Sequence, residues 1–125
     1  MTQVQQPISQ LLVQVQLDLA PTLSLDELLT HCEAIASEVP DITEYQFEEG
    51  HENGPFLNLH FGTNDPISAW THIRRVVFED DYFGQALKVA SMAMCTGESG
   101  WNDYVLLYHY DPNVACVPIF GPSAL

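Results

Sequence analysis

Positive charge is scarce in this chain. Among its 125 residues, 17 Asp and Glu oppose three Lys and Arg, so the formal net charge is −14. The three cations are Arg74, Arg75 and Lys88. Binding to nucleic acid and to anionic membranes depends on clustered Lys and Arg. The composition therefore predicts that the chain binds neither nucleic acid nor a membrane surface directly.

Long apolar runs and an ordered set of cysteines are also missing. No apolar stretch reaches the ~18 residues that a membrane-spanning helix needs. The segment Met1–Gln6 lacks the basic residues that begin a secretory signal. Cys32, Cys95 and Cys116 are too few and too scattered for a disulfide framework. These features are typical of a reduced chain, so we expect a cytoplasmic protein.

The familiar catalytic motifs are absent as well. Lys88 is the only lysine and follows no glycine-rich loop, which excludes a phosphate-binding P-loop. Residues 97–100 lack the spacing of a serine nucleophile elbow. Adjacent carboxylates such as Glu48 and Glu49 are expected by chance in so acidic a chain, and they do not indicate glycoside hydrolysis. We therefore predict no catalytic residues, no cofactor and no enzymatic activity.

Residues that could bind a metal are present but poorly grouped. His31 and Cys32 are adjacent on a predicted helix, so their side chains point about 100° apart. His51, Glu52 and His60 could meet only if a hairpin turn folded back, and their spacing matches no zinc pattern. We expect solvated polar side chains here and no metal site.

The apolar residues predict one folded domain that begins with a strand and a helix. With 46% hydrophobic residues, the chain can form a core, and its length suits a single acidic α+β domain over residues 1–125. Alternating apolar residues predict a strand over Leu12–Leu19. Ser24–Glu27 is typical of a capping box, and an apolar stripe at helical spacing follows over Leu25–Val39, before Pro40.

The next segment predicts a β-hairpin with one apolar face. Its strands are expected over Thr43–Glu49 and Phe56–Gly62. Pairing Tyr45 with Leu59 places apolar side chains on one face of both strands. The other face then carries the polar residues Glu44, Gln46, Glu48, Asn58 and His60.

A second helix is predicted to begin at Asp65 and Pro66, because Asp is a good N-cap and Pro suits the first helical position. The helix is expected to end near Glu79–Asp81. Arg75 and Glu79 would then form a weak ion pair at i,i+4 spacing.

The remaining sequence predicts a second hairpin, with strands over Ala86–Cys95 and Asn102–Tyr110. Its tightest register places His109 opposite Lys88 rather than Cys95, so we expect no Cys–His nucleophile. A short edge strand could follow over Cys116–Phe120. The element order is thus β-α-β-β-α-β-β, a mainly antiparallel sheet of five or six strands with two helices packed on one face.

The acids are concentrated in the first half of the chain. Residues 1–65 contain eleven acids and no base, whereas residues 66–125 contain six acids and all three bases. Such a negative field attracts a basic protein and speeds its association. The candidate partner-binding residues are Glu44, Glu48, Glu49 and Glu52 on the first hairpin, with Asp80, Asp81, Glu98 and Asp103 as a second acidic rim.

Residues 97–112, with the sequence GESGWNDYVLLYHYDP, resemble segments of small bacterial immunity proteins. These are the cytosolic antidotes of contact-dependent growth inhibition and other polymorphic toxin systems. Because such antidotes differ in fold, the resemblance carries over no binding residues. It implies that the chain neutralises a basic cognate toxin, often a nuclease domain. Carboxylates can occupy a basic cleft made for phosphates, and they form bidentate pairs with Arg.

Three alternatives stay open at this point. A nucleic-acid mimic that inhibits a DNA-binding or phage-defence protein would share the same electrostatics. A small ligand-binding domain or enzyme could use a hairpin pocket with His60 or His109, and a deep pocket with convergent polar groups would favour it. The acidity could also serve only solubility or adaptation to a salty cytoplasm.

Overall fold

The computed structural model describes residues 9–52, 54–79, 81–97, 100–111, 113, 114 and 116. The side chains at positions 76, 81, 97 and 100–104 are outside this description. In the described part, five strands form one open sheet in the order β2-β3-β1-β4-β5, and every neighbouring pair is antiparallel. The strands are β1 (Ser9–Gln16), β2 (Ile42–His51), β3 (Pro55–Thr63), β4 (Ser91–Gly97) and β5 (Gly100–His109).

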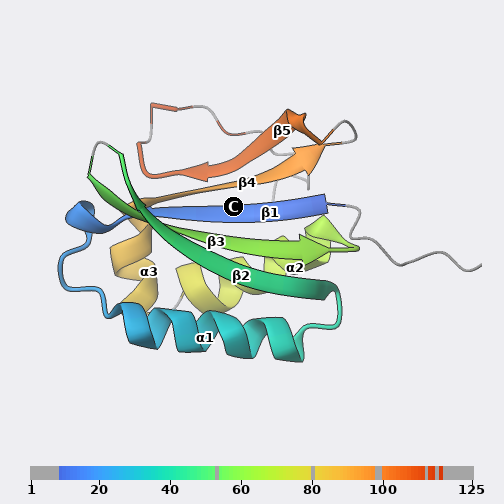
Figure 1. Cartoon of the computed structure of the whole chain (residues 1–125), viewed down its shortest axis with the longest axis horizontal. Helices are drawn as coiled ribbons and strands as arrows, with labels where there is room; N and C mark the ends of the chain where they lie inside the picture. Colours follow the sequence, from blue (N-terminus) through green and yellow to red (C-terminus); the bar gives the residue numbers. More distant parts are fainter. Residues whose placement is uncertain are drawn as a thin grey trace, which may run out of the picture.

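The helices lie along one side of this sheet (Figure 1). They are α1 (Leu25–Glu38), α2 (Pro66–Ile73), the π-helical turn η2 (Arg74–Phe78) and α3 (Asp81–Lys88), and a short 3-10 turn η1 (Leu17–Leu19) follows β1. The core lies between the two layers and includes alternate residues of β1 and β3 together with apolar residues of all three α-helices. None of the helices in the described residues is long and apolar enough to cross a membrane.

Strand β1 lies at the centre of the sheet and alternates in burial from residue to residue. Leu11, Val13 and Val15 are fully buried, while the residues between them are half-buried. The alternation that predicted a strand over Leu12–Leu19 is real, but its bounds were wrong. The strand ends at Gln16, because the chain turns into η1 there.

Both predicted helix starts are confirmed. The Ser24 hydroxyl accepts a hydrogen bond from the Glu27 backbone N–H at 3.3 Å and caps α1. The Asp65 carboxylate accepts from the Ser68 backbone N–H at 3.1 Å and caps α2, with Pro66 at its first position. These caps need only neighbouring residues, which explains why the sequence predicts them well.

The first hairpin forms with the predicted faces but in a different register. Tyr45 pairs with Phe61 rather than with Leu59, and a bulge interrupts the pairing near Ile42. A slip of two residues preserves which side chains share a face, so the apolar pattern is satisfied by either register. The observed register places Gly50 opposite Phe56, whose ring lies where a side chain at Gly50 would be.

The predicted order of elements was wrong in its second half, because the described residues form three α-helices rather than two. The segment that was expected to end a helix near Glu79–Asp81 leads into α3, and the strand expected from Ala86 begins only at Ser91. Phe83 and Leu87 of α3 are both buried, one turn apart. Their apolar character suits a helix or a strand, and packing against the rest of the core selects the helix.

The second hairpin also departs from its predicted register. His109 lies opposite Met92 rather than Lys88, and two irregularities interrupt the pairing of β4 with β5. Cys116 lies outside any strand in the described residues, and the remainder of the edge strand expected over Cys116–Phe120 lies outside the described part of the chain.

Candidate functional site

The predicted acidic hairpin ends at an edge of the sheet. Strand β2 pairs with β3 on one side, and no described strand lies on its other side. Glu44, Glu48, Glu49 and Glu52 are all exposed, and no Lys or Arg occurs anywhere in the first half of the chain. An exposed strand edge offers unpaired backbone groups to another chain.

The four glutamates do not share one face. Glu44 and Glu48 lie on the face of the sheet away from the helices, since they pair with the half-buried polar side of β3. Glu49 lies on the opposite face, where it pairs with the buried Leu57. Glu52 follows β2 in the hairpin turn. A partner that contacts all four must therefore embrace the edge strand rather than lie flat on one face.

One of these carboxylates, that of Glu48, is held in place by hydrogen bonds from its neighbours. Glu48 Oε1 lies 3.2 Å from His60 Nε2 and accepts a longer hydrogen bond of 3.5 Å from Asn58 Nδ2. Asn58 Oδ1 accepts in turn from Gln14 Nε2 at 2.9 Å, so a polar chain crosses three strands. The hydrogen bonds from His60 and then Asn58 hold the pKa of the Glu48 carboxyl below its ordinary value. Glu48 is thus ionised and oriented before any partner arrives.

Glu44 is positioned by a glycine. Its side chain crosses Gly62 of β3, where an added Cβ would lie only 2.6 Å from Glu44 Cγ. Gly62 therefore leaves room for the Glu44 stem, and its carboxylate lies near the far end of the same strand from Glu48.

An aromatic residue interrupts the acidic strand. Phe47 is 47% exposed, although it lies on the apolar face of the hairpin. Its neighbour on that face, Tyr45, packs on Phe61 with ring centroids 5.1 Å apart. The helices therefore cover Phe47 only in part. Glu49 is exposed on the same face of β2, and a large apolar side chain beside carboxylates is typical of a protein-binding anchor.

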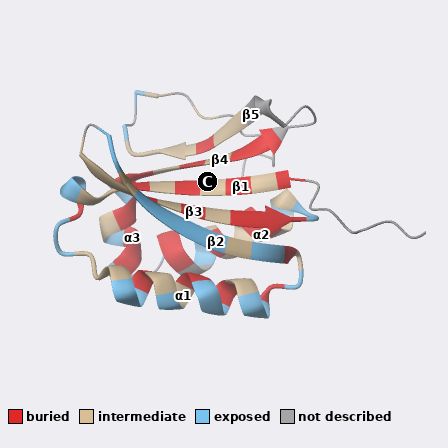
Figure 2. Cartoon of the chain, in the orientation of Figure 1, coloured by how far each residue is buried: buried red, intermediate tan, exposed pale blue. Residues whose placement is uncertain are grey.

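Helix α1 extends the negative surface beside β2. Figure 2 shows exposed positions of α1 and of β2 along the same side of the molecule. The exposed acids of α1 are Asp26, Glu27, Glu33 and Glu38. We call the exposed acids of α1 and β2, together with Glu52 and Phe47, the acidic surface.

The side chains of the predicted second acidic rim lie outside the described part of the structure. Asp103 belongs to β5, at the opposite edge of the sheet from β2, and Asp81 begins α3, but their side chains lie outside the description. Asp80 and Glu98 lie outside the described residues altogether. The described residues place an acidic surface on the β2 side, and the second rim stays a prediction.

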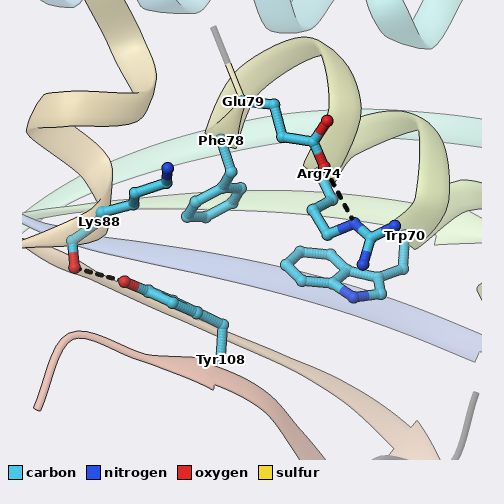
Figure 3. A pocket seen from close by; sticks show the side chains of 6 residues that line it. All are labelled: Trp70, Arg74, Phe78, Glu79, Lys88 and Tyr108. Carbon is cyan, nitrogen blue, oxygen red and sulfur yellow. Dashed lines mark hydrogen bonds and ion pairs between the residues drawn. The ribbon is translucent and has the colours of Figure 1, made fainter. Parts of the chain in front are cut away.

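The structure contains a cavity that sequence reasoning missed. It has a volume of about 260 Å³ and lies where η2, α3 and β5 meet, rather than at His60 or His109. Its lining residues are Trp70, Arg74, Phe78, Glu79, Lys88 and Tyr108 (Figure 3). Trp70, Arg74 and Phe78 follow one another at four-residue spacing on α2 and η2, but no spacing pattern relates them to Lys88 and Tyr108, which come from elements that meet them only in the folded chain.

The predicted ion pair on the second helix is also different. Glu79 Oε2 lies 3.5 Å from Arg74 Nε, whereas the sequence predicted a pair with Arg75. The π-helical turn explains the change, because its hydrogen bond runs from the Glu79 N–H to the Arg74 carbonyl, five residues back. Residues five apart are therefore neighbours here.

The metal and thiol chemistry can be assessed for the part of the chain that the structure describes. There, no group of three or more His, Cys, Asp or Glu side chains is arranged to hold a metal ion. Burial raises the pKa of the Cys32 thiol to about 12 and that of Cys95 to about 11. Such thiols are weak nucleophiles at neutral pH.

In comparisons with known proteins, no protein-family model, no curated protein and no solved structure matches the chain.

Proposed function

We propose that this protein is a cytoplasmic inhibitor that binds a basic partner protein through the acidic surface. The observation that carries the proposal is an exposed edge strand with glutamates on both faces around the exposed Phe47. In accord with the resemblance of residues 97–112 to immunity proteins, we propose that the partner is a cognate toxin and that its active part is a nuclease domain.

The glutamates of β2 determine which chains can pair with the exposed edge. Two copies of the same edge repel each other, because each brings several negative charges to the strand that would pair. A strand or loop rich in Lys and Arg carries the opposite charge, so the edge attracts it. The same side chains thus oppose self-association and favour a basic partner.

A nuclease cleft fits this surface chemically. Such a cleft is basic because it holds phosphates, and Arg side chains there pair with carboxylates as well. Glu48 is already ionised and fixed by His60 and Asn58. A pre-oriented carboxylate loses less side-chain freedom on binding than a mobile one. Inhibition then requires occupation of the cleft and no chemistry by the chain.

The proposal is tested with the partner protein that co-purifies with this chain from its native cells, once that partner has been identified by mass spectrometry and assayed for nuclease activity. Inhibition and association rates are measured for the wild type, Glu49→Lys and Phe47→Ala. Asp111→Lys is the matched control, since it makes the same charge change at an exposed position after β5, the other edge strand. At low salt we expect Glu49→Lys to slow association about tenfold, because rim charges act mainly on the association rate.

Phe47→Ala should instead speed dissociation, with a loss of about 2 kcal/mol in binding free energy if the ring is a buried anchor. Asp111→Lys should change both rates by less than about twofold in the same salt, where only the net charge acts. Two outcomes would each refute the assignment of the interface to β2: both surface variants inhibit and bind as the wild type does, or Asp111→Lys slows association as much as Glu49→Lys.

A further inference from the structure

We infer that the cavity between η2, α3 and β5 binds a small organic monoanion with a flat apolar body, of the class of aromatic carboxylates. The inference is independent of the proposed function, since the cavity contains none of the residues of the acidic surface.

The walls of the cavity are aromatic and fixed. Trp70 and Phe78 meet edge to face with ring centroids 5.5 Å apart, and Phe78 and Tyr108 meet at 5.3 Å. The Tyr108 hydroxyl donates a hydrogen bond to the backbone carbonyl of Lys88, which ties β5 to the end of α3 (Figure 3). A volume of about 260 Å³ is near the lower end for a ligand site. The shape and size suit one aromatic ring with a short substituent.

Two of the three cations in this very acidic chain line the same cavity. Arg74 and Lys88 come from different elements, η2 and α3, and both belong to its lining. Among the described lining residues, Glu79 is the one acid, and it pairs with Arg74. The described lining side chains therefore carry a net charge of +1, in a molecule whose net charge is −14. One anionic group on the ligand balances it.

The environment strengthens such a pairing. The Arg74 side chain is only 20% exposed, so an anion beside it is partly removed from water. Ion pairs gain strength as the local dielectric constant falls. Trp70 is 2% exposed, and its indole Nε1 has no acceptor among the described residues. The indole ring is therefore a buried wall of the cavity, and its N–H is not an exposed donor.

Local backbone features build the cavity. In the π-helical turn, Arg74 and Phe78 lie nearly one turn apart and both contribute to the lining. π-Helical segments are frequent at functional sites. Gly84 lets α3 approach this turn, because a Cβ there would lie 2.2 Å from the Phe78 carbonyl oxygen. Lys88 follows Gly84 by one helical turn, so the close approach that Gly84 permits also brings Lys88 to the cavity.

The test uses the full chain with benzoate as the monoanionic probe. Benzyl alcohol and benzylamine serve as neutral and cationic probes of similar shape. Binding is followed by the indole N–H signal of Trp70 in proton–nitrogen NMR spectra, assigned with the Trp70→Phe variant. We expect benzoate to shift this signal saturably, with a dissociation constant on the order of 1 mM for so small a ligand. Benzyl alcohol should bind about tenfold more weakly, and benzylamine more weakly still.

The charge requirement is tested by two variants that each remove one positive charge, Lys88→Gln and Arg75→Gln, and by Lys88→Arg, which keeps the charge. Lys88→Gln should weaken benzoate binding about tenfold, while Lys88→Arg should retain it. Arg75→Gln is the matched control, since Arg75 is exposed, lies in the same π-helical turn and does not line the cavity. The inference is overturned if benzoate causes no saturable shift, if benzyl alcohol binds as tightly as benzoate, or if Arg75→Gln weakens binding as much as Lys88→Gln.

Discussion

Replacing Gly84 by Ala should have opposite effects on stability: it favours the helical conformation of α3, and it disrupts the packing of α3 against η2. In an isolated helix, this substitution stabilises by about 1 kcal/mol, because Gly loses more backbone freedom than Ala. In this protein the new methyl group would lie 2.2 Å from the Phe78 carbonyl oxygen and 2.9 Å from its carbon. Both are backbone atoms, so no side chain can rotate away.

Relief of this contact requires α3 to move from η2 by roughly 1 Å, if a carbon–oxygen contact of about 3.3 Å is to be restored. The movement would loosen the packing of Phe83 and Leu87, which are buried on α3. Overpacking of this kind costs typically 1–3 kcal/mol. At the upper end of that range, and after the gain in helix propensity, we expect a net loss of about 1–2 kcal/mol.

Urea unfolding measures this difference directly. For a domain of this size, the loss corresponds to a fall in the midpoint of about 1 M with an unchanged slope. Gln85→Ala is the control, since Gln85 is exposed on the same helix and its replacement should change stability by less than about 0.5 kcal/mol. A Gly84→Ala variant as stable as the wild type, or more stable, would show that α3 does not pack against the Phe78 carbonyl.

Two further predictions concern ionisable groups. In the native protein at pH 8, Cys32 and Cys95 should react with a thiol reagent far more slowly than the less buried Cys116. The reason is that burial raises the pKa of the Cys32 thiol to about 12 and that of Cys95 to about 11. Mass spectrometry of the labelled chain measures the three rates, and modification of Cys32 as fast as Cys116 would contradict the prediction. The pKa of Glu48 should lie below its ordinary value of about 4.3 and return toward it in His60→Leu, which has no hydrogen-bond donor, as followed by NMR. Because the folded pKa is the lower one, the pair stabilises the fold above the unfolded pKa, and this contribution is lost as pH falls through the folded pKa. An unchanged Glu48 pKa in His60→Leu would contradict the assigned hydrogen bond.

The local features of the fold could be predicted from the sequence. The caps at Ser24 and Asp65 involve residues three positions apart, and the stripes that follow them repeat with the helical period. The alternation in β1 and the two faces of the first hairpin also follow from short-range periodicity. The acidic character of β2 needs no fold at all to be recognised.

Register is the first property that periodicity leaves undetermined. A shift by two residues keeps every side chain on its face, so pairing Tyr45 with Leu59 or with Phe61 satisfies the same pattern. Contacts such as the Phe56 ring over Gly50 distinguish the two. The sequence contains both residues, but whether the Phe56 ring contacts Gly50 depends on how the two strands pair in three dimensions.

The exposure of Phe47 and the pairing of Glu48 with His60 were likewise settled by tertiary structure. The hairpin pattern predicted the faces of these residues, and not how far the helices would cover the edge strand. Nothing in the spacing of Glu48 and His60 distinguishes an interacting pair from two separate side chains, because the hairpin register decides which groups meet.

Composition and short-range periodicity thus determined the negative charge, the alternation in β1, the two faces of the first hairpin, and the capped starts of α1 and α2, since each depends on residues a few positions apart. Helix α3, the π-helical turn and the cavity were decided by packing alone. The lining residues span positions 70 to 108, and their contacts form only when η2, α3 and β5 are brought together. Interactions between such distant positions have no fixed sequence spacing, so no local pattern could reveal that two of the three cations share one aromatic cavity.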